Sequence, residues 1–86
     1  MVNLQVRERL PEGAVILDNQ AYDASIIGVT LDGRAIYEYG SMVQEHMTDN
    51  ECNEDEAVDW IDYNTLRALP YFGPRTPIVV QALTDR

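Results

Sequence analysis

The chain has 86 residues, with fifteen acidic and six basic side chains, a net charge of −9 and 45% apolar residues. This length allows one hydrophobic core, so we expect a single domain over residues 1–86, with residues 1–12 as a loosely ordered arm. Cys52 is the only cysteine, which excludes an intramolecular disulfide. No apolar run reaches the roughly 18 residues of a membrane-spanning helix. We therefore expect an unanchored protein of a reducing cytoplasm.

The acidic side chains are concentrated in one part of the chain. Residues 38–62 contain nine of them and no lysine or arginine, whereas the rest of the chain contains six acids and six arginines. The whole net charge therefore arises in this stretch. A surface of one sign attracts a partner of the opposite sign and accelerates their encounter. The distribution indicates association with a positively charged partner.

The first half of the chain predicts strands. The apolar run at 14–18 is short and strand-like. Residues 25–31 and 34–39 are rich in β-branched and apolar side chains, and Asp32-Gly33 between them is a typical tight-turn pair. We expect an antiparallel hairpin over about 25–39 with a primed turn, in which Gly28 marks a bulge or a close approach by another segment.

The second half predicts two helices and a last strand. Ser41 and Gln44 have the spacing of a capping box before a short helix at about 41–48, and Asn53 and Glu56 repeat it before a longer helix at about 54–69. In a straight helix Leu66 would face outward, so we expect a break or restart near residues 64–65. Three prolines within 70–77 end the helix, and 78–83 is a strand.

These elements predict an α+β fold. A small antiparallel sheet, formed by the hairpin and the short strands near 14–18 and 78–83, would pack against the two helices. At 100° per residue, the apolar side chains of the longer helix gather on one side and its aspartates on the opposite side. The longer helix is therefore expected to have an acidic outer side.

This acidic outer side is the candidate site. Acids in a first helical turn complement the helix dipole, but the others have no cation four residues away, which exposed helices usually gain from. Asp55, Asp59 and Asp62 would lie about 5 to 6 Å apart, a scale comparable with the roughly 3.4 Å spacing of phosphates along one DNA strand. The predicted partner-binding residues are Asp55, Asp59, Asp62, Glu45, Asp49, Glu51, Glu54 and Glu56.

Other chemistry has weaker support in the sequence. Residues 49–60 alternate acids like a calcium loop, but Glu54 replaces the required glycine and Trp60 the required glutamate. His46 and Cys52 are the only residues of their types, and we interpret them as a surface histidine and an ordinary thiol. No nucleophile motif surrounds any serine or the cysteine. We expect no metal, no cofactor and no catalysis.

Residues 26–39 and 56–71 carry a resemblance. Their Asp-Gly hairpin and their Asn64-Thr65-x-Arg67 junction together resemble a family of small bacterial proteins from prophages and other mobile elements. In size and charge, such proteins are similar to anti-CRISPR proteins, some of which imitate duplex DNA. This resemblance implies a bacterial host cell, with the aspartates of the longer helix standing for phosphates and the other acids widening the patch.

Two functional hypotheses follow. The first is a non-enzymatic inhibitor whose acidic, DNA-mimicking surface binds a positively charged nucleic-acid-binding protein, a CRISPR-Cas effector, and blocks its binding of target DNA. The alternative is an accessory or regulatory interaction domain of a mobile element with a merely solvated acidic face, whose partner binds at 70–77 or at the sheet edge. In either case we expect a monomer that binds neither nucleic acid nor membrane.

Overall fold

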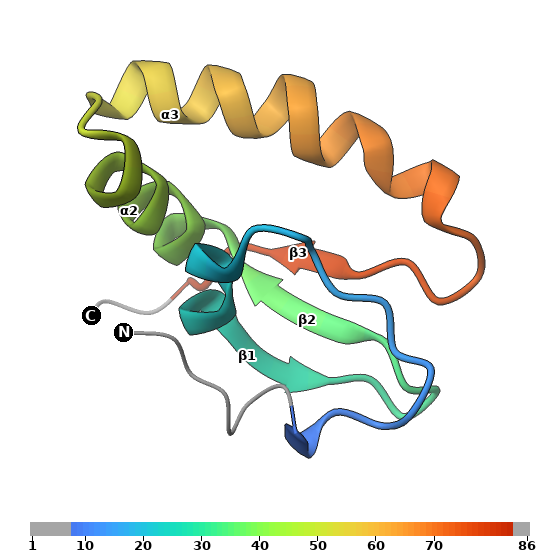
Figure 1. Ribbon diagram of the computed structural model, residues 1–86. Helices are drawn as coiled ribbons and strands as arrows, with labels where there is room; N and C mark the ends of the chain where they lie inside the picture. The colour runs from blue at the N-terminus through green and yellow to red at the C-terminus, as the bar shows by residue number, and fades with distance from the viewer. Residues whose placement is uncertain (1–7, 84–86) are drawn as a thin grey trace.

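The computed structural model describes residues 8–83, so that residues 1–7 of the predicted arm lie outside the described part. A three-stranded sheet packs beside helices, which confirms the α+β class (Figure 1). In chain order the elements are the 3-10 helix η1 (Gln20–Ser25), β1 (Ile26–Val29), β2 (Ala35–Glu38), α2 (Tyr39–Asn50), α3 (Glu54–Trp60), the π-helix η2 (Ile61–Thr65), the 3-10 helix η3 (Leu66–Phe72) and β3 (Ile78–Val80).

The sheet is mixed, so the prediction of a wholly antiparallel sheet was wrong. Its order is β1-β2-β3, with β2 antiparallel to β1 and parallel to β3. Parallel neighbours need a long crossover, and the helices between β2 and β3 supply it. The strand predicted at 14–18 is also wrong. Leu17 is buried there, but its amide donates to the hydroxyl of Tyr37 at 2.9 Å instead of to a neighbouring strand.

The hairpin and its bulge are confirmed, although the turn differs from the predicted primed type. The register shifts between Ile26 and Gly28, which places a bulge beside that glycine. The amide of Gly33 donates to the carbonyl of Thr30 at 3.0 Å, and φ is positive at Gly33. This is a three-residue loop in which glycine alone takes the left-handed conformation, the other common use of an Asp-Gly pair.

Helix α2 begins two residues earlier than predicted, because a carboxylate at the end of β2 caps it. The side chain of Glu38 accepts hydrogen bonds from the amides of Gly40 at 3.1 Å and Ser41 at 2.8 Å. It also accepts one from the amide of Ala82 at 3.3 Å. The predicted Ser41 cap is therefore wrong, and the hydroxyl of Ser41 accepts from Ser25 instead. Glu38 is buried and does not belong to the acidic surface.

The second predicted capping box is confirmed, and the helix that it opens is longer than expected. The amide of Glu56 donates to the side chain of Asn53 at 2.8 Å, and the amide of Asn53 donates back to Glu56 at 3.0 Å. The chain then stays helical through α3, η2 and η3 (Figure 1). We call residues 54–72 the helical rod. The break predicted near 64–65 is a π-turn over Ile61–Thr65.

This π-turn explains where the later residues of the rod point. A straight α-helix would turn Leu66 about 180° away from the buried Ala57, onto the outer side. A π-turn contains about one residue more than an α-turn. Each residue after it therefore takes the angular position around the helix axis that the preceding residue would have in a straight α-helix. Thr65 is buried as a result, and Leu66 is half-buried and packs against the core.

The core lies between one face of the sheet, η1 and the two helical segments. Its buried apolar members are Leu17, Tyr22, Ala35, Tyr37, Met42, Val43, Ala57 and Ile61. His46 is 4% exposed, so the prediction of a surface histidine was wrong. Its Nδ1 forms a 3.0 Å hydrogen bond with the hydroxyl of Tyr22, which supplies the partner that a buried imidazole needs.

We expect Glu38→Ala to lower the free energy of unfolding by about 1–3 kcal/mol, because two helix amides and the amide of Ala82 lose their acceptor. Urea denaturation followed by circular dichroism measures the change. The matched control is Glu12→Ala, which removes an exposed carboxylate and should change the free energy of unfolding by less than about 0.5 kcal/mol. Equal effects of the two substitutions would contradict the capping role.

Candidate functional site

Three of the predicted site residues gather on one side of the helical rod. Asp55, Asp59 and Asp62 are exposed, on the side away from the buried Ala57 and Ile61. Successive members are four and three residues apart, which is about 6 Å and about 4.5 Å along the helix axis. We call these three aspartates the acidic row. The helical period thus places the three aspartates on one exposed side, as predicted from the sequence.

The other five predicted residues lie elsewhere. Glu54 and Glu56 are exposed in the first turn of α3, where Glu56 completes the capping box. Glu45 and Asp49 are one turn apart on α2, and Glu51 is its C-cap residue in the left-handed conformation, with φ 54°. These three acids belong to a different helix from the acidic row. Glu56 has a structural role that accounts for its presence.

Tyr39 joins the acidic row to the rest of the fold. Its hydroxyl donates a 2.9 Å hydrogen bond to Oδ1 of Asp62, across 23 positions in the chain. Burial raises the pKa of Tyr39 to about 12, and the hydrogen bond to Asp62 and the negative charges of Asp62 and Asp59 contribute to the rise. The sequence reasoning did not predict this residue, because nothing local connects it with Asp62.

The pKa of a second tyrosine, Tyr22, is affected by one acid of α2, Asp49. Burial raises the pKa of Tyr22 to about 12; the hydrogen bond with Thr65 opposes the rise, and the charge of Asp49 adds to it. Asp49 therefore acts on Tyr22, while Asp59 and Asp62 act on Tyr39. Asp49 on α2 and the aspartates at 59 and 62 on the rod therefore have different tyrosine neighbours.

Two open grooves adjoin Asp62. One, of about 500 Å³, is lined by Asp59, Asp62, Tyr63 and Arg67. The guanidinium of Arg67 lies over the ring of Tyr63, 4.9 Å from its centre. The other groove, of about 490 Å³, runs between the rod and β3 and is lined by Tyr39, Asp62, Leu66, Leu69, Val79, Val80 and Gln81. A partner that binds the acidic row would meet Tyr63 and the cation of Arg67 on one side. On the other side it would meet mainly apolar side chains.

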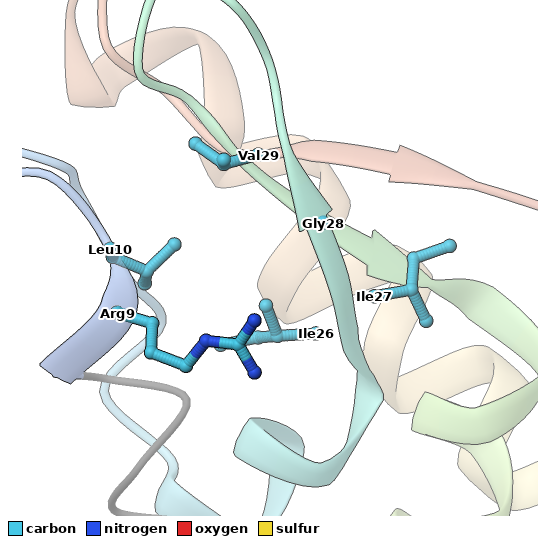
Figure 2. Close-up of a pocket in the computed structure, with 6 residues that line it drawn as sticks. All are labelled: Arg9, Leu10, Ile26, Ile27, Gly28 and Val29. Carbon is cyan, nitrogen blue, oxygen red and sulfur yellow. The ribbon is translucent and has the colours of Figure 1, made fainter.

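A separate cavity of about 190 Å³ lies at the β1 edge of the sheet. Figure 2 shows Arg9 and Leu10 facing Ile26 across it, while Ile27 points to the other side of the strand. The charged side chain in its lining is a cation. This cavity does not belong to the acidic row.

Metal-ligand clusters and membrane-spanning helices are both absent from residues 8–83. Within 8–83, no three histidine, cysteine, aspartate or glutamate side chains gather as ligands for a metal ion. No helix in the same range has the length and apolar character to span a bilayer. His46 is held in the core between Tyr22 and the ring of Trp60, whose centre is 4.9 Å away.

Comparison with protein-family models, with curated proteins and with solved structures finds no significant match to this chain. The resemblance to proteins of prophages and mobile elements therefore stays a prediction.

We expect Asp62→Asn to lower the pKa of Tyr39 from about 12 toward its ordinary value, because the substitution removes one of the two neighbouring negative charges. The ultraviolet absorbance of tyrosinate, or the ring resonances of Tyr39 by NMR, follows the titration. The matched control is Asp55→Asn. Asp55 belongs to the same row but is not one of the charges that raise the pKa of Tyr39, so this substitution should leave that pKa unchanged. A pKa of Tyr39 unchanged by Asp62→Asn would contradict the contact.

Proposed function

We propose that the protein is a non-enzymatic inhibitor that presents the acidic row to the nucleic-acid-binding surface of a positively charged protein and competes there with DNA. A CRISPR-Cas effector is the partner that the resemblance implies. The observation that carries the proposal is the exposure of Asp55, Asp59 and Asp62 together on one side of the rod. Within residues 8–83 none of the three forms an ion pair.

The fold supports this proposal by holding the row rigidly. The capping box fixes the start of α3, and the hydroxyl of Tyr39 fixes the carboxylate of Asp62. A preorganised row loses less conformational entropy on binding than the same charges on a loop. Carboxylates a few ångströms apart on one line can be met by lysines and arginines that otherwise bind phosphates.

The location of the acids along the rod supports it further. Favourable interaction with the helix dipole falls off within the first turn, so it covers Asp55 but neither Asp59 nor Asp62. Like charges one turn apart repel each other by a few tenths of a kcal/mol. Among the three, only Asp62 gains a hydrogen bond within the fold, from Tyr39. The repulsion between the charges opposes folding, whereas a cationic partner would gain from all three.

The test is a competition experiment with a purified CRISPR effector complex and fluorescent target DNA. We expect the protein to displace the DNA, and the triple variant Asp55→Asn, Asp59→Asn and Asp62→Asn to compete roughly tenfold less well, since three exposed charge pairs are lost. Added salt should weaken the wild-type competition, because the complex depends on exposed charges.

The control variant changes the same number of charges elsewhere. Glu8→Gln, Glu12→Gln and Asp32→Asn together also bring the net charge from −9 to −6, but all three side chains are exposed outside the rod. This variant should compete as well as the wild type. If both triple variants lose competition equally, the total charge and not the acidic row is responsible. If the wild-type protein does not compete with DNA at all, the proposal is refuted for this effector.

A second candidate function is an interaction domain that binds its partner through the 70–77 segment. The side chain of Tyr71 is 87% exposed there, which favours a contact surface. Under this alternative, Tyr71→Ser would abolish capture of the host partner in a pull-down, while the triple asparagine variant of the acidic row would retain it. The reverse pattern supports the inhibitor.

A further inference from the structure

The opposite flank of the rod carries a second feature, a groove with aromatic walls. Its volume is about 210 Å³, and it runs between the segment before and within η1 and the rod. Tyr22, Trp60 and Phe72 supply aromatic rings, and Asp18, Asn19 and Asn64 supply polar groups. The volume is below the roughly 300 Å³ at which pockets for drug-sized ligands begin, so the groove suits one side chain and not a whole cofactor.

The π-turn helps to build this groove. Residues Ile61–Thr65 place Thr65 inward against Tyr22, and Nδ2 of Asn64 donates to the carbonyl of Trp60 at 3.0 Å. The inner polar groups are thereby satisfied, since the hydroxyl of Tyr22 also bonds His46. π-turns occur frequently at functional sites.

Large aromatic surface is left exposed at the groove. Trp60 is 45% exposed and Phe72 is 40% exposed. His46 packs against Trp60, yet the indole is not drawn into the core. Removing these aromatic rings from water lowers the free energy, so contact with them would strengthen the binding of a partner.

Two polar groups of the groove, the carboxylate of Asp18 and Oδ1 of Asn64, can accept hydrogen bonds, whereas Oδ1 of Asn19 already accepts one from the amide of Ala21. Asp18 is its one charged lining residue among those described, and its carboxylate is exposed. Nδ2 of Asn64 makes the hydrogen bond to Trp60, and Oδ1 of the same side chain has no hydrogen bond within residues 8–83. Acceptors and aromatic faces together suit a planar cation with several donors, and a protein of net charge −9 repels anions.

We propose that this groove binds the side chain of an arginine from the partner. A guanidinium stacks on aromatic faces and donates up to five hydrogen bonds, whereas an ammonium is compact and strongly hydrated. The aliphatic stem of the arginine would cover the apolar lining. The identity of the partner as a cationic protein rests on the proposed function, but the preference of the groove for guanidinium can be measured without that partner.

Trp60 is the only tryptophan, so its fluorescence reports directly on the groove. We would titrate the protein with acetyl-arginine amide, acetyl-lysine amide and the neutral isostere acetyl-citrulline amide at constant ionic strength. Arginine should give a saturable change, lysine a weaker one and citrulline the weakest. No saturable change with arginine, or an equal change with citrulline, overturns the proposal.

Two variants locate the binding. Asp18→Asn should weaken arginine binding about two- to fivefold, the equivalent of one exposed ion pair. Phe72→Ala should also weaken it, because one ring is lost. Amide NMR spectra of each variant check that the fold is intact and whether the shifts on titration map to the groove. Binding that is unaffected by both substitutions contradicts the assignment.

The triple asparagine variant of the acidic row separates this inference from the proposed function. It should bind acetyl-arginine amide as well as the wild type does, because none of its substitutions lines the groove. If arginine binding persists while competition with DNA is absent, the groove stands and the inhibitor proposal fails. If the triple variant loses arginine binding, the amide was binding to the acidic row and the groove proposal is wrong.

Discussion

The structure depends on one widened turn in its longest helical segment. A regular helix from 54 to 72 would rotate its apolar stripe off the sheet, because the apolar residues after Ile61 do not keep the spacing of those before it. The π-turn at Ile61–Thr65 inserts about one extra residue into the helix, which rotates Leu66 back toward the core. The acidic row lies before and at this turn, and the aromatic groove lies beside it.

Two consecutive residues, the last of β2 and the first of α2, connect the sheet to the helices. Glu38 caps α2 and also accepts the amide of Ala82, which follows β3. Tyr39 then reaches Asp62 on the rod. One strand end therefore fixes the start of α2, the end of β3 and the middle of the rod relative to one another. The orientation of the acidic row is set by this junction as much as by the helix that carries it.

Several features that depend on neighbouring residues could be predicted, although the cap of α2 by Glu38 was missed and the turn type was wrong. Features that depend on distant residues could not be predicted. The hairpin, the bulge beside Gly28 and the Asn53 cap follow from local spacing, and the acidic row follows from the helical period. The bond from Glu38 to Ala82 spans 44 positions and that from Tyr39 to Asp62 spans 23, so no local pattern indicates them. The burial of His46 could not be predicted either, because its hydrogen-bond partner, Tyr22, lies 24 positions away.

The two flanks of the rod differ in how a ligand would be held. The acidic row offers charge in contact with solvent, where each pair with a cation contributes little and salt weakens it. The groove beside Trp60 offers partly buried aromatic surface, where contact contributes more for each side chain and depends less on salt. The charge of the acidic row would accelerate the encounter with a cationic partner. Insertion of an arginine side chain into the groove would slow dissociation of the complex. A cationic partner that spans the rod could therefore gain both speed of association and a long-lived complex.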